Sequence, residues 1–277
     1  MKRLIKVELK KLLNYSLFKV LTAMYLGLFL LCILLFPQIE LNLSFQQDVD
    51  LLDIRLFYTF PIIWNAYAWM ASKFNILLAI IIIFLIGNEF SFRTFKQHIL
   101  DGLSRMELIA GKLMVIVLIA LGSFVIIFLS SLIMGLIYSD DISISLIVQN
   151  LPVLFVYLIQ ACAYMSMAMF IVMLVKNKTV SIVVFLSYSV IVEPLIRLII
   201  RKYVLTEMVF YFPARVIFNL TPVPENALVS FVTVNAESEG GGLIGGGLPL
   251  YQNLIIALIY FAIFIYFSLR ILKRRDM

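Results

Sequence analysis

Long apolar runs alternate with short polar segments along the whole chain. A run of about twenty residues is long enough to cross the ~30 Å hydrocarbon core of a bilayer as a helix, because each residue adds ~1.5 Å. The pattern predicts six transmembrane helices, at about residues 17–36, 67–87, 113–138, 151–175, 179–200 and 250–269. We therefore expect an all-α membrane protein in which residues 1–277 form a single transmembrane domain.

The segment before the first apolar run is amphipathic and basic. Leucine and isoleucine recur near helical spacing over residues 4–13, and lysines fill the positions between them. This pattern is typical of a helix that lies on an anionic membrane surface. The alternative is a simple overhang of the first span. The run 17–36 exceeds the apolar region of a cleaved signal peptide and lacks its cleavage site, so a retained span is expected.

The second span has a clear end at Gly87 and an unclear beginning. The apolar run 74–87 is too short to cross a bilayer alone, and its extension to residue 67 includes Lys73. We expect the Lys73 side chain to reach the interface, or alternatively to face a cavity. Aromatic residues suited to a membrane interface precede it: Trp64, Tyr67 and Trp69.

Composition supports the same class. The chain is 63% hydrophobic and 14% charged, whereas a soluble domain contains ~45–50% apolar and ~25% charged residues. The net charge of +6 does not predict a nucleic-acid partner, because basic residues gather on the cytoplasmic loops of membrane proteins. With the N-terminus inside, cytoplasmic segments hold 16 basic residues and the other side holds 6. Both termini are therefore predicted to be cytoplasmic.

The polar connector 88–112, between the second and third apolar runs, carries its own folding signals. Asp101-Gly102 predicts a turn, and Ser104 with Glu107 matches a helix capping box. The residues before the turn alternate between apolar positions (Phe90, Phe92, Phe95, Ile99 and Leu100) and polar ones (Arg93, Lys96, Gln97 and His98). The connector is expected to form a short amphipathic helix, a turn, and a capped helix that continues into the third span.

This connector resembles the first cytoplasmic loop of ABC-2-type permeases, the membrane subunits of ATP-binding-cassette exporters. The resemblance rests on Asn88-Glu89-Phe90, Arg93-Thr94, Gly102-x-x-Arg105 and Gly111-Lys112-Leu113. The plan of the chain is also similar, with an interfacial N-terminal helix, six spans and a long external loop at 201–250. The chain departs from the family in Arg93, where many members have glycine, and in lacking a proline before Ser104-Arg105.

The resemblance implies that this chain and a separate ATPase subunit share the transport function in a bacterial cytoplasmic (inner) membrane. The chain has no phosphate-binding Gly-x-x-x-x-Gly-Lys-Ser/Thr loop, so it is expected to bind no cofactor and to be no enzyme. A separate cytoplasmic ABC ATPase would use ATP and Mg, and a second permease copy or a homologue would complete the transporter in the lipid bilayer. The implied ATPase-coupling residues are Glu89, Phe92, Arg93, Thr94, Phe95, Lys96, His98, Gly102, Ser104, Arg105 and Lys112.

The sequence leaves two pairings of charged residues open. Glu89 and Arg105 are expected to pair across the connector, the alternative being that both are solvated. Glu193 and Arg197 lie within the fifth span and are four residues apart, so they share a helix face. Pro194 removes one helix hydrogen bond and favours a kink. Either Glu193 and Arg197 form a structural salt bridge at the outer mouth, or Glu193, Pro194 and Arg197 belong to an outer gate or substrate exit.

Other functions have less support. No catalytic constellation and no metal-ligand spacing is present, and the glycine-rich stretch 240–247 favours a flexible linker. An ion-coupled carrier would need charged relays in several spans, but the third, fourth and sixth have none. A non-transporting membrane scaffold stays open as an alternative. The substrate is not predicted by any motif.

Overall fold

The chain folds into a bundle of helices. The computed structural model describes residue 8 and residues 10–35, 57–92, 94–100, 102–139, 142–203, 207–222 and 248–274. Within these ranges the regular elements are all helical, and six helical stretches are long and apolar enough to cross a membrane. The prediction of an all-α membrane protein with six spans is confirmed.

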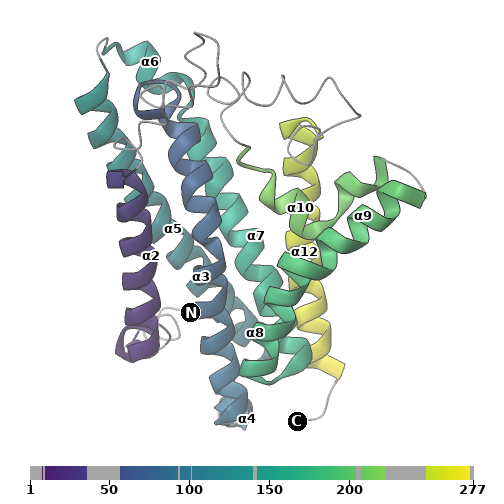
Figure 1. Cartoon of the computed structure of the whole chain (residues 1–277). Coiled ribbons are helices and arrows are strands. Elements are labelled where there is room, and N and C mark those ends of the chain that lie inside the picture. The colour runs from purple at the N-terminus through teal and green to yellow at the C-terminus, as the bar shows by residue number, and fades with distance from the viewer. Residues whose placement is uncertain are drawn as a thin grey trace.

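The six spans come in sequence order, and shorter helices lie between some of them (Figure 1). The spans are α2 (Ser16–Leu35), α3 (Ile63–Ser91), α5 (Arg105–Tyr138), α7 (Pro152–Val175), the series α8 (Lys178–Ser187), η3 (Tyr188–Val192) and α9 (Glu193–Tyr203), and α12 (Leu250–Arg274). The shorter helices are α4 (Thr94–Leu100), α6 (Ile144–Gln149), η4 (Glu207–Tyr211) and α10 (Pro213–Phe218). Helix α4 and the C-terminal end of α12 lie at one end of the bundle, and α6 lies at the other.

The second span is longer than predicted at both ends. Helix α3 begins at Ile63 instead of residue 67, and it continues to Ser91 past the predicted end at Gly87. The polar residues at its end stay helical because buried or half-buried lysines satisfy them: Lys178 donates to Asn88 Oδ1 over 3.1 Å, and Lys112 donates to Glu89. Polar residues can therefore remain in the helix where other side chains of the protein pair with them.

Helices α3 and α7 form the centre of the bundle, and the other spans pack around them. A buried polar chain joins the central helices to α2. The Tyr157 hydroxyl of α7 donates to Asn75 Oδ1 of α3 over 3.0 Å and lies 3.2 Å from the Tyr25 hydroxyl of α2. Because polar groups in an apolar interior are costly when unpaired, these hydrogen bonds favour one register of the three helices.

The fifth span and the loop after it differ from their predicted boundaries. Helix α9 continues to Tyr203, into the predicted external loop 201–250. The span is also interrupted, because a π-helical turn at 188–192 comes directly before Glu193-Pro194. Pro194 has no N–H to complete the ladder, which accounts for irregular helix at this position. Part of the predicted loop folds as α10, which packs on α7 and α12.

A glycine allows α3 and α8 to approach closely. A Cβ atom built at Gly87 would lie 2.6 Å from the Cβ and 2.9 Å from the Cα of Lys178. The second distance involves backbone, which cannot rotate away. Small residues permit this kind of helix contact in membranes.

Replacing Gly87 with alanine is expected to destabilise the fold by about 1–3 kcal/mol, the usual cost of overpacking. Thermal unfolding of the purified protein in detergent measures the effect. Gly122→Ala is the matched control, because no atom lies within 4 Å of a Cβ at Gly122. Equal unfolding temperatures for the two variants would contradict the close contact.

Candidate functional site

The connector between α3 and α5 has the order that the sequence predicts. After α3 ends at Ser91, α4 spans Thr94–Leu100, and Gly102 follows with a φ of +91°. This left-handed backbone favours glycine, since a Cβ would strain it. Helix α5 then starts at Arg105 and continues without interruption into the third span.

The start of α5 carries the predicted capping box. Ser104 Oγ accepts a hydrogen bond from the Glu107 backbone N–H over 3.2 Å. Glu107 Oε2 accepts from the Ser104 N–H over 2.9 Å and from its hydroxyl over 2.7 Å. Such caps typically stabilise a helix by about 1 kcal/mol. They define where the connector ends and the rigid span begins.

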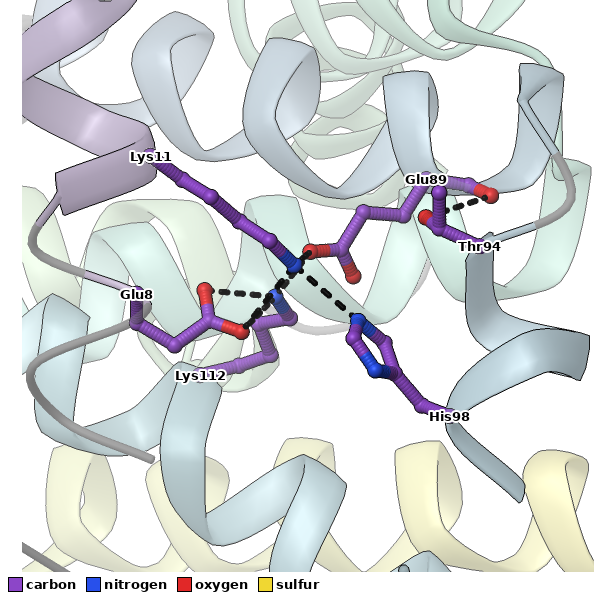
Figure 2. A network of polar contacts seen from close by, with 6 residues as sticks. All are labelled: Glu8, Lys11, Glu89, Thr94, His98 and Lys112. Atoms are coloured by element: carbon purple, nitrogen blue, oxygen red, sulfur yellow. Dashed lines mark hydrogen bonds and ion pairs between the residues drawn. The ribbon is translucent and has the colours of Figure 1, made fainter. Parts of the chain in front are cut away.

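Four charged side chains form an ionic cluster next to this connector, three of them buried and Lys11 partly exposed: Glu8, Lys11, Glu89 and Lys112 (Figure 2). Lys112 is at its centre and is only 1% exposed. Its Nζ donates to both carboxylate oxygens of Glu8, over 2.9 and 2.8 Å, and to Glu89 Oε1. Both carboxylates are themselves buried. The cluster joins the N-terminal segment, α3 and α5.

Lys11 and His98 extend the ionic cluster to α4. Lys11 Nζ donates to Glu89 Oε1 over 3.3 Å and lies 3.0 Å from His98 Nε2 (Figure 2). An ammonium group has only donors, so His98 Nε2 is the acceptor in this contact. The Thr94 hydroxyl also donates to the Glu89 carbonyl oxygen over 3.3 Å. Helix α4 is therefore tied to two other segments by its own side chains.

The charges of the ionic cluster balance, with two carboxylates against two ammonium groups. Burying them is tolerable because each charge has an opposite partner, whereas removing one partner leaves an uncompensated buried charge. One oxygen, Glu89 Oε2, is buried and has no hydrogen-bond partner among the described residues. The carboxylate of Glu89 thus contacts Lys11 and Lys112 through its other oxygen.

The predicted pair between Glu89 and Arg105 is wrong. Arg105 Nη1 instead donates to the Lys273 carbonyl oxygen of α12 over 2.6 Å. The reason is position along the helix: Arg105 opens α5, and Lys112 lies seven residues further on, or ~10 Å along the axis. That step brings Lys112, and not Arg105, to the level of Glu89.

Sequence reasoning missed Glu8 and Lys11 as members of the site. A signal for Glu8 was available, because it is the one acidic residue in an otherwise basic amphipathic segment. It lies four residues before Leu12, so the two share a helix face. Leu12 is buried, and residues 10–14 are helical. An acid on the buried face of a basic helix predicts a buried cation opposite it.

The remaining predicted coupling residues occupy different environments. Phe92 is 71% exposed, and His98 is half-buried against Lys11. Arg93 lies outside the described residues, as do the side chains of Phe95 and Lys96. Gly102 and Ser104 have backbone and capping roles. The connector thus combines a buried ionic face with exposed apolar side chains.

At the other predicted site, Glu193 binds backbone amides. Its buried carboxylate accepts from the Ala214 N–H over 2.9 Å and from the Arg215 N–H over 2.7 Å, at the start of α10. The predicted partner is also present, with Arg197 Nε 4.0 Å from Glu193 Oε1. The shorter contacts are those to α10, so the main structural role of Glu193 is to hold that helix. Pro194 follows in the first turn of α9.

Lys112→Met is expected to destabilise the protein by about 3–5 kcal/mol, because two buried carboxylates lose their central cation. Hydrogen exchange should also increase in the N-terminal segment around Leu12. Lys10→Met is the control, since Lys10 is exposed. In a double-mutant cycle with Glu8→Gln, a coupling energy near zero would contradict the ionic cluster.

Comparison with known proteins does not place the chain in a family. No protein-family model matches it, and no curated protein matches it. The resemblance of the connector to ABC-2-type permeases therefore stays a prediction that rests on the residues themselves.

Proposed function

We propose that this chain is the permease subunit of an ABC transporter that exports a substrate, with ATP hydrolysed by a separate nucleotide-binding subunit docked on residues 88–112. The observation that carries the proposal is the attachment of α4 to the bundle. This short helix outside the spans contacts the ionic cluster, because its His98 lies 3.0 Å from Lys11. A surface loop with no mechanical role has little reason to be anchored in this way.

The arrangement suits a transmitter of force. A displacement of α4 moves His98 and Thr94, which contact Lys11 and the backbone of Glu89. Lys112 then connects Glu89 to the rigid span α5. Because opposite buried charges resist separation, the N-terminal segment, α3 and α5 move together when α4 is pushed. Small shifts at a docking site are amplified in this way when the packed elements have discrete arrangements.

The outer side of the connector suits a protein partner. Phe92 and Leu100 are 71% and 77% exposed. Large apolar side chains outside the spans, beside a buried ionic face, mark a contact surface. Basic residues predominate in the termini and the connector, which supports a cytoplasmic position for this end of the bundle. A cytoplasmic ATPase is the partner that fits both features.

Affinity purification of the full chain from its native membrane is expected to recover an ABC ATPase. Phe92→Asp with Leu100→Asp should reduce that recovery at least about tenfold, since charge replaces the apolar contact. Ile144→Asp is the control, because Ile144 is 82% exposed at the opposite end of the bundle. Unchanged recovery by the double variant, or normal transport by the purified chain without an ATPase, would overturn the proposal.

A further inference from the structure

Helix α10 is held at both ends by buried polar side chains. Glu193 of α9 accepts from the amides that begin it. At its other end, Gln160 Nε2 of α7 donates to the carbonyl oxygens of Ile217 and Phe218, over 2.9 and 3.1 Å. Thr221 Oγ1 in turn donates to Gln160 Oε1 over 2.8 Å. These contacts determine where the Phe218 ring lies.

The Phe218 ring faces a lysine on the central helix. Lys73 Nζ of α3 is 3.7 Å from the centroid of the Phe218 ring and 5.0 Å from that of Trp69. Lys73 therefore contacts α10 by a cation–π interaction. The sequence had left open where the Lys73 side chain points, and the structure directs it toward Phe218. It lies ten residues from the start of α3, or ~15 Å along the helix, well inside the span.

Lys73 has no anionic partner in the described part of the chain. None of the ion pairs or hydrogen bonds of the described residues includes Lys73, and the carboxylate of Glu193 in the fifth span is bound to α10 and Arg197. A cation inside a span is costly, and two aromatic rings compensate it only in part. Lys73 is half-buried and Phe218 is 45% exposed, so the protein encloses this pair only in part.

We infer that Lys73, with Trp69 and Phe218, binds the anionic headgroup of an amphiphile, a carboxylate or a phosphate attached to an apolar chain. A lysine ammonium recognises either anion as a point charge. The depth of the site requires a ligand with an apolar body, since a small hydrated anion would lose its water on entering the span. The inference rests on the proposed function only in identifying this amphiphile with the exported substrate.

The position of Trp69 provides a direct assay. The full chain is reconstituted in phosphatidylcholine nanodiscs and titrated with 5-doxylstearate, whose nitroxide lies near the carboxylate and quenches tryptophan fluorescence. Saturable quenching is expected that the neutral methyl ester does not produce and that Trp69→Phe removes. Lys73→Met should weaken the apparent Kd about tenfold or more, and Lys73→Arg should retain binding. Lys202→Met is the control, because Lys202 is an exposed lysine 5.2 Å from the Tyr203 ring.

Equal quenching by the methyl ester, or undiminished quenching in Lys73→Met, would overturn the site. Nanodiscs made with brominated phosphatidylglycerol or brominated phosphatidylcholine then distinguish the source of the anion. Extra quenching by the anionic lipid that Lys73→Met removes indicates a bilayer headgroup, and its absence indicates a free amphiphile. The assay contains no ATPase, so a failure here leaves the proposed coupling intact, and failed ATPase recovery leaves this site intact.

Discussion

The contact on which the arrangement of this protein depends is the burial of Lys112 between Glu8 and Glu89. Each of these side chains would be prohibitive alone in an apolar interior, and they are tolerated because Lys11 joins them and two ammonium groups balance two carboxylates. The consequence is geometric. Three segments distant in the sequence must meet at one point, and Lys11 adds α4 through His98. The ionic cluster therefore sets the positions of the N-terminal segment and of the connector relative to the spans.

A second constraint acts inside the bundle, where packing and polar satisfaction replace charge. Gly87 lets α3 approach α8, and the chain of Tyr25, Tyr157 and Asn75 joins α2, α7 and α3. Apolar contacts alone discriminate poorly between helix registers in a bilayer, because lipid tails satisfy the same side chains. Small residues and paired polar groups supply that discrimination. They hold the central helices rigid between the two ends of the molecule.

The half of the bundle away from α4 follows a related principle with a different result. Glu193 and Gln160 use buried polar groups to hold α10, a helix of six residues that would not be stable alone. That fixed helix carries Phe218 to Lys73. The molecule thus has an anchored connector at one end. Further along the bundle it has an anchored short helix beside Lys73, a cation without an anionic partner among the described residues. Rigid spans α3 and α7 connect these regions, which suits coupled movement of the two.

The sequence by itself determined the class, the six spans, and the turn and capping box of the connector. These follow from local rules, because span length, glycine at a turn and Ser-x-x-Glu each act within a few residues. Only the tertiary structure decided that Glu89 pairs with Lys112 instead of Arg105, and that Glu8 joins them. Ion pairs between distant segments depend on how far each side chain sits along its own helix and on how the helices are staggered. Neither quantity is encoded locally, so a charge pattern indicates which residues need partners without showing which partners they find.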